Sequence, residues 1–132
     1  MEMSASWVTA AIEGSSREVA IRVGASTLVA RQPGDGREST GPPTPLDLLL
    51  AGLGACTAIT LNQYAAARHW PLEVVEVDLE ITSRAKSASV TRLLSLKGSL
   101  DLNQREELLA AAEQTPVTLL LAPGVRIHTE LA

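Results

Sequence analysis

The chain has 132 residues, 45% of them hydrophobic, and a formal net charge of −4 from 11 basic and 15 acidic residues. This length predicts one domain over residues 1–132, large enough for a hydrophobic core. The basic residues form no cluster and the chain has only two Trp, one Tyr and no Phe, so binding to nucleic acid is not expected.

The sequence features that indicate cellular location, namely targeting signals, membrane spans and cysteine content, favour the cytoplasm. The start of the chain, MEMSASWVTA, has neither the basic nor the apolar segment of a signal peptide. The longest apolar run, residues 48–61, is shorter than the roughly 20 residues that cross a bilayer. A single cysteine forms no internal disulfide, and its spacing from the two histidines does not suit a metal site. We expect a cytoplasmic protein with no membrane partner, metal or other cofactor.

The first third of the sequence predicts three β-strands. The segments SWVTAAIEG and REVAIRVG are separated by turn-prone residues, and Val19, Ile21 and Val23 alternate with polar or small residues. STLVARQ predicts the third strand. Residues 31–43, RQPGDGRESTGPP, lack periodicity. A long irregular loop in a compact domain is often functional, and a solvated connector is the alternative.

A long helix is predicted to follow, with Thr44 as its cap, Pro45 at its first position and Asp47 completing a capping box. From there to Leu61 the residues are apolar on every side of the helix, so the helix must be covered all round. A small domain has few elements to cover it, and we therefore expect it to pack partly against a second subunit. The helix is expected to end before Pro71.

Two strands, two helices and a last strand complete the predicted order. LEVVEVDLEIT has an apolar face and an acidic face, and SVTRLLSLKG follows it with Arg92 and Lys97 in position to pair with the acidic face, which is otherwise solvated. NQREELLAAAEQ predicts a helix capped by Asn103, TPVTLLLAPG a short helix capped by Thr115, and VRIHTEL a strand. The order βββ-α-ββ-αα-β indicates an α+β fold with mostly antiparallel sheets.

Cys56, in LLLAGLGACTAITLNQYAAAR, is the only thiol of the chain. A buried lone cysteine usually packs as a small apolar side chain, and this one lies about three turns from the helix start, where the helix dipole has faded. A reactive thiolate would need a nearby cation. The upstream candidates are Arg17, Arg22, Arg31 and Arg37. Gly52, on the same helix face, leaves room for a substrate or a close-packed partner, so both interpretations stay open.

Two stretches resemble the OsmC/Ohr family, the osmotically inducible and organic hydroperoxide resistance proteins. The first motif of that family is similar to GPPTPLDLLLAGLGACTAITLNQYAAARHWPLEVVEVDLEI, and its C-terminal pattern is similar to KGSLDLNQREELLAAAEQTPVTLLLAPGVRIHTEL. The resemblance covers nearly the whole chain. It implies an OsmC-like fold, with mostly antiparallel sheets around a long central helix. It also implies an intertwined homodimer with two active sites at the subunit interface.

The resemblance further implies thiol-dependent reduction of hydroperoxides, preferably organic ones. Cys56 matches the cysteine that attacks the peroxide, and Arg17 is the best match for the arginine that stabilises the thiolate. In the family a second cysteine, in a Cys-Pro-Val or Cys-Pro-Tyr motif, resolves the sulfenic acid as a disulfide that a dithiol reduces. This chain has Thr115 at that position, and Thr118 at one that is often His.

The glutamate of the hydroperoxide-resistance branch also has no direct counterpart, because its position is Leu46 in this chain. Asp47 is one residue later. At roughly 100° per residue, Asp47 lies about 180° around the helix from Cys56. It is therefore a weak candidate for a catalytic acid and a better one for a helix cap.

The favoured hypothesis is a one-cysteine peroxidase for organic hydroperoxides, in which Cys56 is the nucleophile, Arg17 the cation and an external thiol the resolving partner and reductant. One alternative is a non-catalytic homodimer that binds a small apolar ligand, with Cys56 packed or sensing. Another is a purely structural dimer. A guanidinium close to the Cys56 sulfur, beside a solvent-reachable apolar pocket, would favour the peroxidase.

Overall fold

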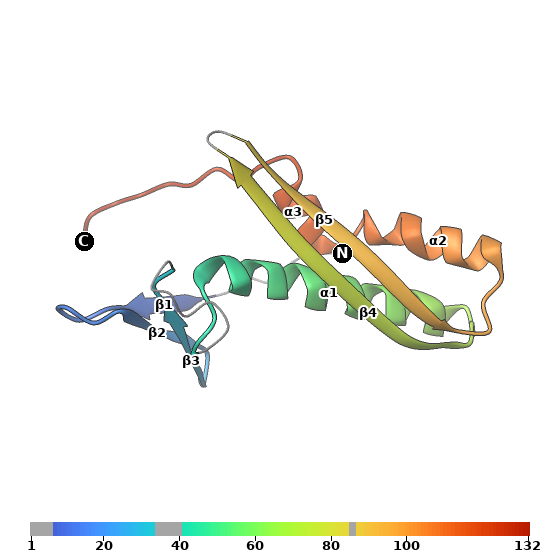
Figure 1. Ribbon diagram of the computed structural model, residues 1–132, viewed down its shortest axis with the longest axis horizontal. Coiled ribbons are helices and arrows are strands. Elements are labelled where there is room, and N and C mark those ends of the chain that lie inside the picture. Colours follow the sequence, from blue (N-terminus) through green and yellow to red (C-terminus); the bar gives the residue numbers. More distant parts are fainter. Residues whose placement is uncertain (1–6, 34–40, 85–86) are drawn as a thin grey trace. The chain divides into compact units, whose positions relative to one another are not determined.

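The computed structural model describes residues 7–33, 41–84 and 87–132 (Figure 1). The chain divides into two compact units, residues 1–51 and 52–132, and the boundary falls within the longest helix. Both sheets are antiparallel, and the mixture of helices and strands confirms the predicted α+β class. Arg37, one of the candidate cations, and most of the irregular loop lie outside the described residues.

The first unit contains the predicted three-stranded sheet. Its strands β1 (Val8–Ala11), β2 (Glu18–Val23) and β3 (Ser26–Arg31) are neighbours in chain order, and Ile21 of β2 lies between Ala10 of β1 and Leu28 of β3. Most of their side chains are exposed, and the two buried residues, Ala30 and Arg31, lie at the end of β3.

The long helix α1 (Pro45–Ala67) begins as the sequence predicts. The Thr44 N–H donates to Asp47 Oδ2 at 2.9 Å, and the Asp47 N–H donates to Thr44 Oγ1 at 3.2 Å, which confirms the capping box. With 23 residues, α1 is longer than its apolar run. By length and composition alone it is a helix that could cross a membrane, a criterion that the core helices of many globular proteins also meet. Its buried residues recur every fourth position: Leu53, Thr57, Leu61 and Ala65.

The second unit packs a long hairpin and two helices on that buried side of α1. The hairpin joins β4 (Leu72–Arg84) to β5 (Ser87–Gly98), and α2 (Leu102–Ala112) and α3 (Pro116–Leu121) follow. In Figure 1 the hairpin lies across the second half of α1, with α2 alongside. The core consists of Leu61, Ala65, Leu108 and Ala112, against which β4 and β5 pack partly buried residues.

Arg92 corrects one prediction, because it does not belong to the acidic face. It lies opposite Leu79 in the hairpin, in phase with Val90 and Leu94 rather than with the acidic residues of β4. Its ion pair is with Glu113, at the end of α2. The alternation of β5 decides this outcome, since every second side chain of a strand points to the same face. Among the described residues, no ion pair joins Lys97 to β4.

Two further predictions are wrong. The cap of α2 is Asp101 and not Asn103, because the Asp101 carboxylate accepts the Gln104 N–H at 2.8 Å and the Gln104 side chain accepts the Asp101 N–H at 2.9 Å. Residues 125–132 form no strand, although Val125, Ile127 and Leu131 have strand spacing. A strand needs the edge of a neighbour to pair with, and this exposed segment is hydrogen-bonded to no described strand.

Candidate functional site

Cys56 is a free, half-buried thiol on α1. It shares a stripe of the helix with Gly52, Ile59 and Gln63, at spacings of four, three and four residues, and the other three are exposed. A Cβ placed on Gly52 would meet no atom within 4 Å, so the space beside that residue is open. The sequence-based expectation of room on the Cys56 face is confirmed at Gly52.

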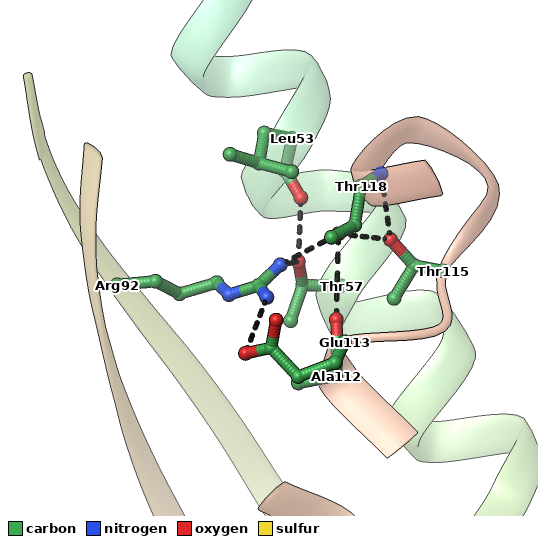
Figure 2. A network of polar contacts seen from close by, with 7 residues as sticks. All are labelled: Leu53, Thr57, Arg92, Ala112, Glu113, Thr115 and Thr118. Carbon is green, nitrogen blue, oxygen red and sulfur yellow. Dashed lines mark hydrogen bonds and ion pairs between the residues drawn. The ribbon is translucent and has the colours of Figure 1, made fainter. Parts of the chain in front are cut away.

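The residue after Cys56 belongs to a polar network that sequence reasoning did not predict (Figure 2). Arg92 of β5 points toward α1, and its Nη1 donates to Thr57 Oγ1 at 3.0 Å and to Thr118 Oγ1 at 2.9 Å. Its Nη2 lies 3.4 Å from Glu113 Oε1. Thr57 is fully buried and donates its hydroxyl to the Leu53 carbonyl at 2.7 Å. One guanidinium therefore connects α1, β5 and α3.

Thr115 continues this network and caps α3, as predicted. Its Oγ1 accepts the Thr118 N–H at 3.2 Å and lies 2.6 Å from Thr118 Oγ1. The Thr118 hydroxyl in turn donates to the Ala112 carbonyl oxygen at 3.3 Å. Thr115 has no exposed surface. The position that the family resemblance assigns to a second cysteine is thus closed to solvent and held by a hydroxyl that has neighbours of its own.

A cavity of about 430 Å³ lies beside Arg92, between β5, the end of α2 and α3. Its walls are mostly aliphatic, and Arg92 and Glu113 are the charged residues among the side chains that line it. Leu53, one turn before Thr57 on α1, also contributes to the wall, whereas Cys56 does not. The second unit therefore contains an apolar cavity with a guanidinium at its wall.

The arginines predicted to act on Cys56 belong to the first unit and differ in burial. Arg17 and Arg22 are exposed, whereas Arg31 is 5% exposed and its backbone N–H donates to the Pro43 carbonyl at 3.0 Å. The pKa of the Asp47 carboxyl is lowered, first by the hydrogen bond from the Thr44 N–H, then by that from the Thr44 hydroxyl, with a smaller contribution from the charge of Arg31. Asp47 is thus the acidic partner of Thr44 in the capping box of α1.

Among the described residues no three His, Cys, Asp or Glu side chains are grouped so that they could hold a metal ion. The sequence did hold a signal for Arg92, which is the one charge in the apolar phase of β5. Thr57 and Glu113 carried no comparable signal, because only the folded chain brings them to Arg92.

Comparison with known proteins identifies the family. The sequence profile described as OsmC-like protein matches residues 36–130. The chain belongs to the OsmC-like protein family. No curated protein matches it.

Solved structures share the fold over nearly the whole chain. An OsmC-like protein from Mycoplasma pneumoniae is similar with a TM-score of 0.77 and 15% identity, covering 95% of this chain and 96% of that one. The organic hydroperoxide resistance protein OhrB of Bacillus subtilis is similar with a TM-score of 0.65 and 21% identity, covering 92% of this chain and 94% of that one. An organic hydroperoxide resistance protein OsmC from Legionella pneumophila is similar with a TM-score of 0.70 and 21% identity, covering 95% of this chain and 94% of that one. These similarities establish the OsmC-like fold.

Proposed function

We propose that this protein is a thiol-dependent peroxidase that reduces organic hydroperoxides, with Cys56 as its nucleophile. The observation that carries the proposal is the place of Cys56: a half-buried thiol beside open space at Gly52, within the matched part of an OsmC-like chain. Two of the similar structures are named organic hydroperoxide resistance proteins. A thiol in this position is covered enough to be held in place and open enough to meet a small substrate.

The reaction balances with an external thiol. The Cys56 thiolate attacks one peroxide oxygen, the O–O bond breaks, and the second oxygen leaves as an alcohol after taking a proton, so that Cys56 becomes a sulfenic acid. An external thiol then forms a mixed disulfide with Cys56 and releases water. A second thiol displaces Cys56, which returns reduced. Thr115 has no sulfur with which to resolve the sulfenic acid, and the resolving thiol must therefore come from outside the chain, as the reductant does.

The cation, the assembly and the compartment belong to the same proposal. Arg17 is the thiolate-stabilising residue that the family resemblance assigns, and Arg31 is a second candidate. The working unit is a homodimer in the cytoplasm with no resident cofactor. Exposed aliphatic residues on α1, such as Ile59, support the dimer, because a second subunit would cover them.

Peroxide consumption tests the proposal. We expect wild type to consume cumene hydroperoxide with dithiothreitol as reductant, Cys56→Ser to be inactive, and Ala55→Ser, a neighbouring exposed position, to remain active. Intact mass should show one added oxygen per chain after limiting peroxide, and further addition after excess. Arg17→Gln and Arg31→Gln identify the cation, because its loss should move the activity profile to higher pH. Equal activity of wild type and Cys56→Ser would contradict the proposal.

One alternative is supported by its own observation. The cavity at Arg92 is not lined by Cys56, and this favours a protein that binds a small ligand without transforming it. An inactive wild type that still binds a ligand in this cavity would make that alternative the function.

A further inference from the structure

We propose that the cavity at Arg92 is a binding site for a small amphipathic carboxylate, whose head pairs with the Arg92 guanidinium and whose apolar body fills the space between β5, α2 and α3. The proposal does not depend on peroxide chemistry, since Cys56 is not part of the cavity wall. It rests on which donors of Arg92 are occupied, on the composition of the walls and on the position of Glu113.

The guanidinium of Arg92 has hydrogen-bond donors that its protein partners do not fully use. Its Nη1 is occupied by the hydroxyls of Thr57 and Thr118. Its Nε–H has no partner among the residues that the structure describes, and Nη2 has only the Glu113 carboxylate at 3.4 Å. A guanidinium presents Nε–H and Nη2–H along one edge, and that edge matches the two oxygens of a carboxylate. The two threonines fix the opposite side of the group, so its orientation is already set.

Glu113 neutralises Arg92 only weakly. Its side chain is 67% exposed, whereas that of Arg92 is 12% exposed, and their 3.4 Å separation is long for a charge-assisted hydrogen bond. Because the Glu113 carboxylate is largely hydrated where it stands, the ion pair contributes little on its side, and Glu113 can turn fully into solvent at small cost. A ligand carboxylate held inside the cavity would be less hydrated and better aligned than Glu113. The charge of Arg92 therefore selects an anion.

The walls select the rest of the ligand. The aliphatic residues of the lining include Leu53, Val90, Leu94, Leu109 and Leu121. A volume of about 430 Å³ falls within the range of roughly 300–1,000 Å³ that is typical of small-molecule sites. Burial of an apolar body against these walls is favourable in proportion to the area covered. A flexible aliphatic chain with a terminal carboxylate satisfies both parts of the site.

Calorimetric titration with decanoate, decanol and decyltrimethylammonium, below their micellar concentrations, tests the proposal on the full chain. Decanoate should bind once per chain and about tenfold or more tighter than decanol, the difference expected for a charge-assisted hydrogen bond. Decyltrimethylammonium should bind weakest, because Arg92 repels it. Equal binding of decanoate and decanol, or no binding of decanoate, would overturn the proposal.

Two variants separate the ligand site from a structural role of Arg92. Arg92→Gln should lose the preference for decanoate, but it also removes hydrogen bonds to two threonines. Glu113→Gln leaves those contacts intact and removes the competing carboxylate, so it should bind decanoate several-fold tighter. Unchanged or weaker binding by Glu113→Gln would contradict the assignment of Arg92 as anchor. Cys56→Ser should bind like wild type, and loss of binding there would place the ligand in the thiol site instead.

Discussion

Arg92 shows how much a single residue can reveal in a sequence. Its neighbours in phase along β5, Val90 and Leu94, are aliphatic, so strand alternation alone places Arg92 on the inner face of the hairpin. The sequence-based prediction assigned it to the acidic face of β4 because opposite charges attract, and that reasoning ignored the register. Buried polar groups need partners, and a charge in an apolar phase is therefore a signal that polar residues from other elements will meet it.

The partners of Arg92 could not be predicted from the sequence. Thr57 and Thr118 are 61 positions apart in the chain, and their hydroxyls meet the same Nη1 only because α1 and α3 both pack against β5. The places of Cys56 and Thr115 in a thiol site were assigned through family motifs, whereas local physics predicted only the helix cap at Thr115. The sequence therefore predicted the thiol and the absence of its usual partner, but not the network that occupies the partner's place.

Asp47 gives a pH-dependent prediction. Its folded-state pKa is lowered from 3.8 by the hydrogen bonds from Thr44, so the charged carboxylate stabilises the folded state above that value, and this contribution is lost as the pH falls through the lowered pKa. Asp47→Asn keeps a hydrogen-bond acceptor but not the charge. We expect its melting temperature to be lower than that of wild type at neutral pH, and the difference to shrink below pH 3.8.

Thermal unfolding between neutral pH and acid provides the measurement. Thr44→Ser, which keeps the hydroxyl of the capping box, is the control and should follow the wild-type pH dependence. A melting-temperature difference between wild type and Asp47→Asn that stays constant at every pH would mean that the charge of Asp47 does not stabilise α1.

At the scale of elements, periodic segments were predicted well and their ends less well. The strong alternation of β2 and β4 and the apolar run of α1 each specify an element on their own. The cap of α2 was misplaced by two residues, because Asp101 and Asn103 are both good capping residues and only the backbone conformation separates them. The missing last strand has a different cause: pairing depends on an edge that its own sequence does not supply.

Gly98 and Gly124 both have positive φ, and a comparison of the two tests how tightly the open end of the hairpin is packed. Gly98, with φ of 141°, pairs with Leu72 at the start of β4, and a Cβ there would collide with the Pro71 carbonyl oxygen. Gly124, with φ of 90°, would meet no atom within 4 Å. Gly124→Ala should therefore cost about 1 kcal/mol of backbone strain. Gly98→Ala should cost at least about 3 kcal/mol, because backbone must also move.

Urea unfolding of the two variants measures this difference in unfolding free energy. Since both replacements add the same methyl group to a residue with positive φ, Gly124→Ala serves as the matched control for strain alone. Similar losses of unfolding free energy in the two variants would show that the Pro71 carbonyl moves away easily and that the hairpin end is not tightly packed.

At the scale of the whole molecule, few apolar side chains of the described residues are buried. The buried core of the described residues is limited to Ala30, Leu53, Leu61, Ala65, Leu108 and Ala112. In contrast, Ile59, Leu93 and Leu109 are more than half exposed. Single exposed aliphatic residues are ordinary, but many together indicate surfaces that another molecule covers. The helix α1 combines exposed Ile59 with open space at Gly52 on one stripe, and this is the surface on which we expect a second copy to pack.

The homodimer prediction follows from that stripe. Wild type should be a dimer by light scattering at micromolar concentration, and Ile59→Glu should dissociate it, because an unpaired carboxylate in a buried interface costs about 3–5 kcal/mol. Leu102→Glu is the matched control. Leu102 is also exposed, at 73%, but it lies at the start of α2, where a negative charge is favourable. A monomeric wild type, or a dimer that tolerates Ile59→Glu as well as Leu102→Glu, would exclude α1 as the interface and with it an active site shared between two subunits.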